Sequence, residues 1–407
     1  MEDGRKRGIG PLAGVRVLDL SDVVAGPMAT LYLAMLGAEI IKLENPKRGG
    51  DVNRQSAPKE NGNSVRFCTL NHNKKSIAVD LSTPEGKQLF LKLAACSDIV
   101  IENYRHGVMD RLGLGFEEMK KVNPRIVYGN ISGFGSTGPY RDRPAYDVIA
   151  QALSGVAMMN GEEGGPPVKV GTSIGDVIAG MNLAMGVIAA LREAERTGEG
   201  QHVEVALVDA MIASLMMDNI TYLHHGEVPK RTGNGYREWS PYGIYPAKDG
   251  HYALGVGSER FYEVLCRDVI GHPELLEDER CLSHNRRIHH REVTEDRLNE
   301  WAAQHTVQEV CTALDAAGIP NAPVNTIRET AQDPHFAEAR NMFPTYDQPG
   351  IGAVRVTNLP LRFPENGDVP LTAAPALGEQ TREILADLLG MDEKTILEMR
   401  DNGVLTF

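Results

Sequence analysis

The chain has 407 residues and carries 42 Lys and Arg against 55 Asp and Glu, which gives a formal charge of −13. Hydrophobic residues make up 42% and charged residues 24%, as in an ordinary globular protein long enough for two or three domains. The acidic balance argues against a general nucleic-acid binder, which normally presents a basic face.

The first two hundred residues alternate short apolar runs with segments of helical periodicity. We expect strands at Val15–Leu20, Glu39–Leu43, Ser76–Leu81, Asp98–Glu102, Ile126–Ile131 and His202–Val205, and helices at Met28–Leu36, Glu85–Ala95, Phe116–Val122 and about Val177 to Arg196. Strand–helix–strand units of this kind pair their strands in parallel, so the pattern predicts an open α/β sheet.

The composition changes after residue 217. Residues 218–245 are rich in turn residues and aromatics and are predicted to form a linker, and residues 246–326 a smaller domain. For the remainder we expect strands at His251–Val256 and near Val324, and helices at Glu259–Val269, Val307–Ala317, Thr381–Leu389 and Asp392–Asn402.

The five cysteines are scattered and form no CxxC pair, which favours neither a zinc site nor a disulfide framework. A reducing cytoplasm is the expected location. The first ten residues lack the apolar core of a signal peptide. The most apolar stretch, Ile174 to Leu191, contains Gly175, Asp176 and Gly180, so we expect no membrane span.

Several common motifs are missing. The turn after the first strand, Ser21–Pro27, lacks the GxGxxG fingerprint, which disfavours standard dinucleotide binding. No Walker A, HExxH or GxSxG sequence occurs. Three histidines, at positions 284, 289 and 290, lie among the arginines 286, 287 and 291. A solvated basic face explains them better than a metal site, because no carboxylate or thiolate falls at ligand spacing.

The segment Gly171–Asp176 is a glycine-bracketed turn that leads into a long apolar helix. Asp176 falls near the start of that helix, where a carboxylate caps free backbone N–H groups. The same position would also keep a nucleophilic carboxylate ionised. The local pattern leaves both interpretations open.

Seven stretches, in chain order, carry a family resemblance. They read PLAGVRVLDLSDVVAGPMATLYLAMLGAEIIKLENP, GGDVNR, LNHNKKSIAVDL, DIVIENYRHGVMDRLGLG, NPRIVYGNISGFGSTGPY, RPAYDVIAQALSG and GDVIAGMNLAMGVIAAL. The chain resembles the class III CoA-transferases, the family of formyl-CoA, carnitine and bile-acid CoA-transferases, from Leu12 to the APALGEQT stretch that ends at Thr381.

The resemblance implies a Rossmann-like large domain built from both ends of the chain, residues 1–217 and 327–407, with the smaller α+β domain between them. It also implies an interlocked homodimer, although a heteromeric assembly stays open. The substrates would be an acyl-CoA and a small carboxylic acid. Neither a permanently bound cofactor nor a metal would be needed.

The resemblance also assigns roles to residues. Asp176 matches the family nucleophile, which would form an aspartyl anhydride and then an aspartyl-CoA thioester. Tyr146 and Asp147 match residues that line the active site. Five further positions match the region that contacts CoA, and these are Lys74, Asn103, Tyr104, Arg105 and Arg111. Arg and Lys side chains suit phosphate oxygens. The alternative for Lys74, Arg105 and Arg111 is that they only keep the protein surface soluble.

Two departures concern specificity. Oxalate-specific formyl-CoA transferases resemble this chain but carry a glutamine where Val24 stands, and a run of four glycines where residues 233–257 have only scattered glycines. Oxalate is therefore not the expected acceptor. The segment Trp239–Tyr242 would either shape a less polar acyl pocket or pack as an interdomain loop.

Two alternatives to a transferase remain. Acyl-CoA racemases share the fold, but their catalytic histidine falls where this chain has Tyr146, and a tyrosine, with an ordinary pKa near 10, is a poor base at neutral pH. A catalytically silent CoA-binding subunit of a heteromeric transferase is the other, and the presence of Asp176 weighs against it.

Overall fold

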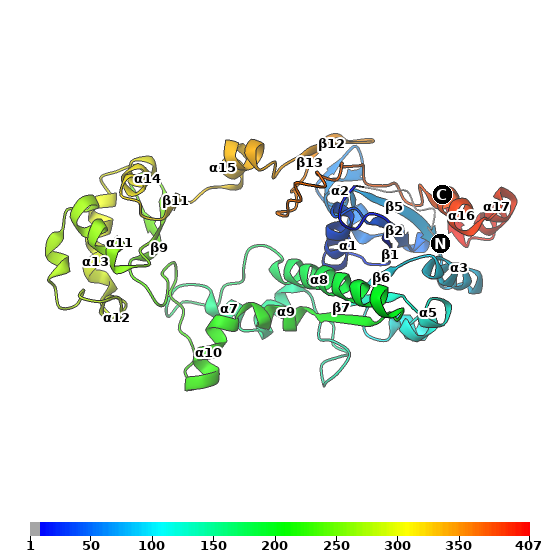
Figure 1. The fold of residues 1–407 in the computed structure, drawn as a ribbon, viewed down its shortest axis with the longest axis horizontal. Helices are drawn as coiled ribbons and strands as arrows, with labels where there is room; N and C mark the ends of the chain where they lie inside the picture. The colour runs from blue at the N-terminus through cyan, green and yellow to red at the C-terminus, as the bar shows by residue number, and fades with distance from the viewer. Residues whose placement is uncertain (1–8) are drawn as a thin grey trace. The chain divides into compact units, whose positions relative to one another are not determined.

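The computed structural model describes residues 9–407, which form two compact units (Figure 1). The first unit takes the chain up to Val156, then Val170–Met216 and His335–Phe407; the second takes Ala157–Lys169 and Met217–Pro334. The second unit therefore includes residues 218–245, expected as a linker, and residues 327–334, expected in the large domain. The supposed linker contains most of helix α10 (Met216–His225) and strand β9 (Tyr242–Pro246), which its turn residues concealed.

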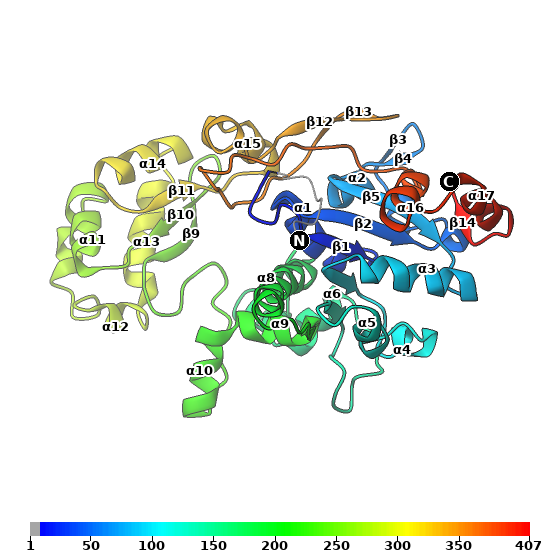
Figure 2. The same cartoon turned by 45° about the vertical axis from the view of Figure 1, so that its right-hand side comes forward.

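A seven-stranded sheet organises the first unit, in the order β14-β5-β2-β1-β6-β7-β8. Figure 2 shows its strands β5, β2 and β1 side by side. Its strands are β1 (Arg16–Asp19), β2 (Glu39–Glu44), β5 (Lys74–Val79), β6 (Ile99–Glu102), β7 (Val127–Ser132), β8 (His202–Ala206) and β14 (Leu405–Thr406). All neighbours are parallel except β14, which pairs antiparallel with β5. The predicted open α/β sheet is confirmed and is parallel apart from β14, the C-terminal strand, which joins it at one edge.

Apolar residues cover both faces of this sheet, as successive strand residues point to opposite sides. In β1, Val17 packs in one core and Leu18 in the other. The Val17 core is closed by α1 (Ala25–Met35), α8 (Ile174–Thr197) and α9 (Leu207–Ser214), and the Leu18 core by α3 (Pro84–Ala95), α5 (Phe116–Val122) and α16 (Thr381–Leu389). The domain is doubly wound, and both cores lie within it.

Helix α8 is long and apolar enough to cross a membrane by length and composition. In this structure it packs in the domain core, where Leu183 and Val187 are fully buried. It also approaches α1 closely, because a Cβ atom at Gly180 would lie only 2.7 Å from the Ala25 carbonyl oxygen. The missing side chain at Gly180 thus lets two core helices meet near their N-terminal ends.

The second unit has a three-stranded antiparallel sheet in the order β11-β10-β9, with β10 at His251–Gly255 and β11 at Asn321–Pro323. Its core gathers Tyr252 and Leu254 from the sheet with residues of α11 (Glu259–Val264), α13 (Arg291–Ala302) and α14 (Val307–Ala316). The remaining elements are β3 (Lys59–Glu60), β4 (Asn63–Ser64), α2 (Val65–Asn71), α4 (Val108–Leu112), α6 (Asp147–Leu153), α7 (Val156–Met159), α12 (His284–Arg287), α15 (Ile327–Gln332), β12 (Thr345–Gln348), β13 (Gly352–Arg355) and α17 (Glu393–Asp401).

The strand order places a switch point between β1 and β6. From β1 the chain winds toward β2 and β5 on one side, and from β6 toward β7 and β8 on the other. In doubly wound sheets the loops at the carboxyl ends of the strands diverge at this point and leave a crevice for ligands. The turn after β1 and the loop after β6 are therefore where a site is expected.

Candidate active site

A hollow of about 210 Å³ lies at this carboxyl edge, and we call it the first hollow. Loops after four parallel strands contribute to its wall: Val23–Ala25 after β1, Asn103–His106 after β6, Ile131–Gly133 around the end of β7, and Leu207 after β8. Asp176 and Tyr146 complete it from the starts of α8 and α6. The fold thus brings Asp176 to the switch point from a distant part of the sequence.

Asp176 is half-buried in the first turn of α8, one residue after the fully buried Gly175. The helix N-cap is Ser173, and its side chain makes no capping hydrogen bond. Burial raises the pKa of Asp176 to about 6, with a further contribution from the negative charge of Asp147, while Arg66 acts in the opposite direction. A carboxylate with a raised pKa is more basic than usual and is still mostly ionised at neutral pH.

Asp147 holds the turn before Asp176 in place. Its Oδ1 atom accepts a hydrogen bond of 2.7 Å from the backbone N–H of Gly175, and its Oδ2 atom accepts one of 2.7 Å from Gln151. A side chain at Gly175 would bring its Cβ to 3.0 Å from the same Oδ1 atom. Tyr146, the preceding residue, is 74% exposed at the rim of the hollow. The pair expected beside Asp176 is therefore next to it.

Asn103 joins the two loops of the switch point. Its Oδ1 atom accepts from the backbone N–H of Asp22 at 2.8 Å, and its Nδ2 atom donates to the Asp22 carbonyl at 2.7 Å. The buried Glu102 accepts from the Tyr104 backbone N–H at 2.5 Å and from the Tyr128 hydroxyl at 2.7 Å. Burial raises the pKa of Glu102 to about 7. These contacts fix the Asn103–Tyr104 stretch, and the Asn103 amide both donates and accepts a hydrogen bond in doing so.

A second hollow, of about 520 Å³, lies along the carboxyl ends of β2, β5 and β6. Its floor is apolar, with Leu43, Val79 and Leu81 from the strands and their following loops. Arg48 and Arg105 stand at its edge, and Tyr104 and Arg105 line both hollows. Arg111 is exposed on α4, the helix whose Val108 and Leu112 border the second hollow. The two hollows therefore share one wall.

Lys74 is the expected CoA contact that the structure does not support. Its side chain is fully buried, and its Nζ atom lies 3.1 Å from Asp19, 2.8 Å from Thr30 and 3.0 Å from Asn71. Burial lowers the pKa of Lys74 to about 8 despite the Asp19 carboxylate. Strand alternation explains the placement, since Lys74 points into the domain and its neighbour Lys75 points outward. We therefore leave Lys74 out of the proposed binding residues.

Three cationic residues near the hollows were not anticipated from the sequence: Arg48 at the second, and Arg141 and Arg143 at the first. Arg143 is held over the Phe134 and Tyr140 rings, with centroid distances of 5.4 and 4.5 Å. Each follows the carboxyl end of a parallel strand, β2 for Arg48 and β7 for the other two. Basic residues at that position of an α/β sheet are the signal that would have found them.

No three His, Cys, Asp or Glu side chains gather as a metal ion would require anywhere in residues 9–407. All five cysteines are free thiols. The basic stretch of residues 284–291 is not uniformly solvated, because Arg287 is only 1% exposed. The first hollow is lined by the carboxyl-bearing Asp176 and by the cationic Arg105, Arg141 and Arg143. Together, the doubly wound sheet and the half-buried Asp176 place a carboxylate in a hollow at the carboxyl edge of the strands, where proteins of this fold class bind their ligands.

Comparison with known proteins identifies the family. Residues 12–381 match the family model described as CoA-transferase family III. The chain belongs to CoA-transferase family III, and the prediction of an enzyme of this family is confirmed.

Curated relatives match over nearly the whole chain. The chain is 34% identical to a succinyl-CoA–D-citramalate CoA-transferase of Chloroflexus aurantiacus, with 97% of this chain and 98% of the relative covered. It is 35% identical to a succinate–glutarate CoA-transferase of Agrobacterium fabrum, covering 93% and 96%. A succinyl-CoA–L-malate CoA-transferase beta subunit of Chloroflexus aurantiacus is 32% identical, covering 97% and 98%.

Solved structures agree with this assignment. A CAIB/BAIF family protein from Brucella suis is 34% identical and superposes with a TM-score of 0.83, covering 93% of this chain and all of that one. A hypothetical protein from Mycobacterium tuberculosis is 30% identical with a TM-score of 0.82, at coverages of 93% and 100%. The fold is therefore that of the CAIB/BAIF proteins.

Proposed function

We propose that this enzyme moves CoA from an acyl-CoA donor to a free carboxylic acid, with Asp176 as the covalent nucleophile. The observation that carries the proposal is the half-buried Asp176 in a hollow at the switch point of a family III CoA-transferase fold. Its pKa, raised to about 6 by burial, suits the role, because the group is ionised at neutral pH and is a better nucleophile than an ordinary aspartate.

The proposed reaction needs no net proton transfer. The Asp176 carboxylate attacks the donor thioester carbon, the C–S bond breaks, and CoA thiolate leaves behind a mixed anhydride. The thiolate attacks the Asp176 carbonyl carbon, releases the donor acid and forms an aspartyl-CoA thioester. The acceptor carboxylate attacks that thioester to give a second anhydride and thiolate. The thiolate finally attacks the acceptor acyl carbon, which yields the new acyl-CoA and restores Asp176.

The two adjoining hollows support a path for CoA. An apolar floor with two arginines at its edge suits a planar base with phosphates, so we place the adenosine end in the second hollow beside Arg48 and Arg105. Arg111 would meet phosphate from α4. The pantetheine arm would pass Asn103 and Tyr104, whose backbone is fixed by Glu102, and bring the thioester to Asp176.

Dicarboxylic acids are the proposed acyl groups. Three of the relatives are named for succinyl-CoA with citramalate, glutarate or malate. In this chain Arg141 and Arg143 lie at the first hollow, and a guanidinium pairs well with the distal carboxylate of such a molecule. Tyr146 would line the acyl site between these arginines and Asp176.

A homodimer is proposed on the basis of exposed apolar surface. The first unit leaves large apolar side chains of α6, α8 and α9 in solvent, and these are Val148, Ile149, Leu153, Met181, Met185 and Ile212. These three helices contact one another, and apolar side chains exposed on neighbouring helices are typical of a protein interface. The interlocked form follows from the family resemblance, and a cytoplasmic location is supported by the five free thiols.

The test is a mass-spectrometric screen for new acyl-CoA products, with succinyl-CoA as donor and glutarate, citramalate and malate as acceptors. We expect transfer by the purified chain alone and its loss in Asp176→Ala. Activity that survives in Asp176→Ala would overturn the mechanism. In deuterated water, label entering the α-carbon of a 2-methylacyl-CoA without acceptor would instead identify a racemase. A requirement for a second polypeptide would identify a subunit of a heteromeric enzyme.

A further inference from the structure

Val23 carries backbone strain at the wall of the first hollow. It lies in the turn between β1 and α1 and has a φ angle of 69°. For a β-branched residue this left-handed conformation is an outlier, and it persists only where the surroundings hold it. Val23 lines the first hollow together with Val24, Ala25 and Asp176. The strained residue therefore belongs to the wall that faces the proposed nucleophile.

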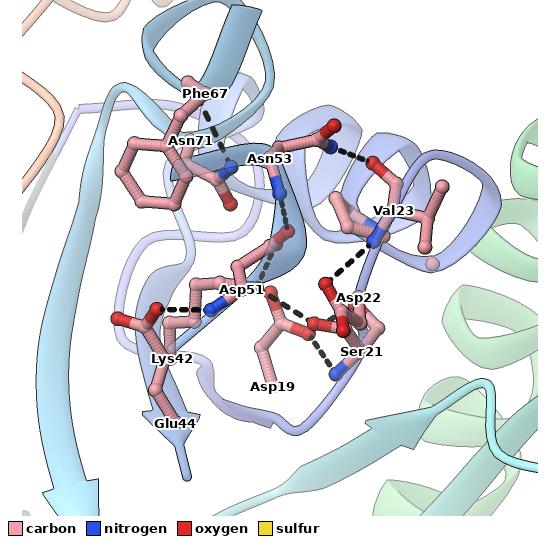
Figure 3. A network of polar contacts seen from close by, with 12 residues as sticks. Asp19, Ser21, Asp22, Val23, Lys42, Glu44, Asp51, Asn53, Phe67 and Asn71 are labelled. Carbon is pink, nitrogen blue, oxygen red and sulfur yellow. Dashed lines mark hydrogen bonds and ion pairs between the residues drawn. The ribbon is translucent and has the colours of Figure 1, made fainter. Parts of the chain in front are cut away.

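Both backbone polar groups of Val23 are held by side chains (Figure 3). Its N–H donates to Asp22 Oδ1 at 2.9 Å, and its carbonyl oxygen accepts a hydrogen bond from the Asn53 amide. The same Asp22 oxygen also accepts from the Val52 N–H at 2.9 Å. Residues 52 and 53 thus each form one hydrogen bond to the strained turn, to Asp22 and to Val23.

Asn53 is itself held in place by hydrogen bonds to its neighbours. It is only 2% exposed, and its Oδ1 atom accepts from the Ser56 hydroxyl at 3.3 Å. Its backbone N–H donates to Asp51 at 2.9 Å. Asp51 in turn forms a 2.9 Å ion pair with Lys42 on β2, and both of these side chains are 1% exposed (Figure 3). The amide that holds Val23 is therefore anchored to the central sheet by a buried ion pair.

Lys42 also contacts the beginning of the turn. Its Nζ atom donates to the Ser21 carbonyl at 2.6 Å, two residues before Val23. The contacts of Lys42, Asp51 and Asn53 thus link Ser21 to Val23 by a path outside the turn itself. A substitution that removes these contacts would let the turn relax without changing any contact of Asp176.

The position of this turn relative to Asp176 depends on close packing. Asp176 and Gly180 are four residues apart on one face of α8, and Gly180 meets the backbone of Ala25. The start of α1 is therefore held by α8 on one side and by the Val23 turn on the other. A relaxed turn would shift Val24 and Ala25 against the nucleophile.

We infer that Asn53 is a positioning residue for the proposed CoA transfer: by holding the Val23 carbonyl it keeps Val23 in its left-handed conformation and fixes the Val23–Ala25 wall opposite Asp176. This inference rests on the proposed function. Asn53 acts through Val23 and has no role in the covalent steps. Since displacements of about 1 Å can slow an enzyme by about 10²-fold, the expected effect is on kcat.

The experiment is a double-mutant cycle of Asn53→Ala and Val23→Gly in the full-length enzyme, assayed with succinyl-CoA and glutarate. Glycine adopts positive φ without steric cost. In Val23→Gly the turn therefore no longer needs the Asn53 hydrogen bond to keep its conformation. Asn53→Ala alone is expected to lower kcat at least about tenfold with the KM for succinyl-CoA changed less than about twofold. In the Val23→Gly background the same substitution should lower kcat by no more than about threefold.

Asn123→Ala is the matched control. The Asn123 amide also donates to a backbone carbonyl, that of Ser97 at 2.8 Å, but it lies at the amino edge of the same sheet. Thermal melts of both variants should show similar losses, and Asn123→Ala should keep the wild-type kcat.

Equal effects of Asn53→Ala in both backgrounds, or a wild-type kcat in Asn53→Ala, would overturn the inference while wild-type transfer leaves the proposed function standing. Absence of CoA transfer by the wild-type enzyme with all donors and acceptors would overturn both.

Discussion

Each unit of the molecule buries cationic side chains, two lysines in the first and Arg287 in the second, and their burial has different consequences. In the first unit Lys42 and Lys74 lie beneath the loops that form the first hollow, among the carboxylates of Asp19 and Asp51. In the second unit Arg287 is equally buried but is held mainly by backbone carbonyls and an aromatic ring. The two lysines lie beneath loops of the proposed site, whereas Arg287 holds segments of the second unit together.

The contacts of Arg287 show the structural case. Its Nε atom donates to the Ser240 carbonyl at 3.2 Å, its Nη1 atom donates to the Cys281 carbonyl at 2.8 Å, and its guanidinium lies 3.9 Å from the centre of the Tyr262 ring. It ties separate segments of the second unit into one core. We expect such a residue to affect stability alone.

The largest effect is expected for Lys74→Met, which removes one of the two buried lysines of the first unit. Burial opposes the Asp19 carboxylate, but Lys74 and Lys42 outweigh it and lower the pKa of Asp19. Removing Lys74 leaves that charge without its nearest partner and should cost about 3–5 kcal/mol in the free energy of unfolding. Chemical denaturation measures it. The KM for CoA substrates should stay unchanged in the folded enzyme, because Lys74 is not exposed.

Arg105→Ala is the matched variant for CoA binding. Arg105 is exposed and lines both hollows, so its loss should raise the KM for succinyl-CoA about tenfold with little change in stability. The reverse pattern, with Lys74 controlling KM and Arg105 controlling stability, would restore Lys74 as a CoA contact.

Arg287→Ala tests the second half of the comparison. Its ion-pair partner Glu259 is 55% exposed, so screening reduces the loss, and we expect about 3 kcal/mol of destabilisation from the orphaned carbonyls and lost packing. The kcat of the folded fraction should equal that of the wild type. The exposed Arg267–Glu263 pair offers a control, since Arg267→Ala should cost about 0.5 kcal/mol or less. A lower kcat in Arg287→Ala would break the comparison.

Gly180→Ala probes how tightly the first unit is packed at its site. The new Cβ would stand 2.7 Å from the Ala25 carbonyl oxygen, so α1 and α8 must separate. Overpacking of this kind costs about 1–3 kcal/mol, and kcat should fall with stability because the Val23–Ala25 wall moves. Gly186→Ala is a useful partner on the same helix, since its Cβ would meet only the tip of Val203 at 2.8 Å. Equal kinetics of both variants would argue against a positioning role for this contact.

The smallest effect concerns pH. Because Asp176 must be ionised to attack and its pKa is about 6, kcat/KM should fall as the pH drops below about 6. Removing the negative charge in Asp147→Asn lowers the pKa of Asp176, so the acid limb should move to lower pH by a fraction of a unit. Arg66→Gln should move it upward. If neither substitution moves the acid limb of the kcat/KM profile, a group other than Asp176 limits the rate at low pH.

The raised pKa also affects stability. Asp176 binds its proton more tightly in the folded state than in the unfolded state, so its contribution to stability is largest below about pH 4 and is lost as the pH rises through about 6. Thermal melts of the wild type and Asp176→Ala across this range would show the difference.

The alternation of strands and helices was predictable from hydrophobic periodicity, and α5 was placed at Phe116–Val122 in agreement with the structure. Helix α13 was missed because half of the residues in its sequence, REVTEDRLNEWA, are charged and only three are buried. Of the candidate site, the motif resemblance located Asp176, Tyr146 and Asp147. The burial of Lys74 could not be predicted, since its exposure depends on which face of β5 turns inward.

The strained turn at Val23 could not be predicted from the sequence either. Nothing in the sequence near Val23 indicates a positive φ angle, because valine rarely adopts one. Its conformation follows from contacts with Asn53, thirty residues away, which only the three-dimensional structure brings together.

The account depends on covalent attack by Asp176, and intact-mass and peptide mass spectrometry after incubation with succinyl-CoA alone test this step. The account predicts a CoA thioester on the peptide that contains Asp176, which is absent from Asp176→Ala and removed when glutarate is added. An enzyme that transfers CoA from succinyl-CoA to glutarate while hydroxylamine and borohydride trapping leave Asp176 unmodified would contradict it.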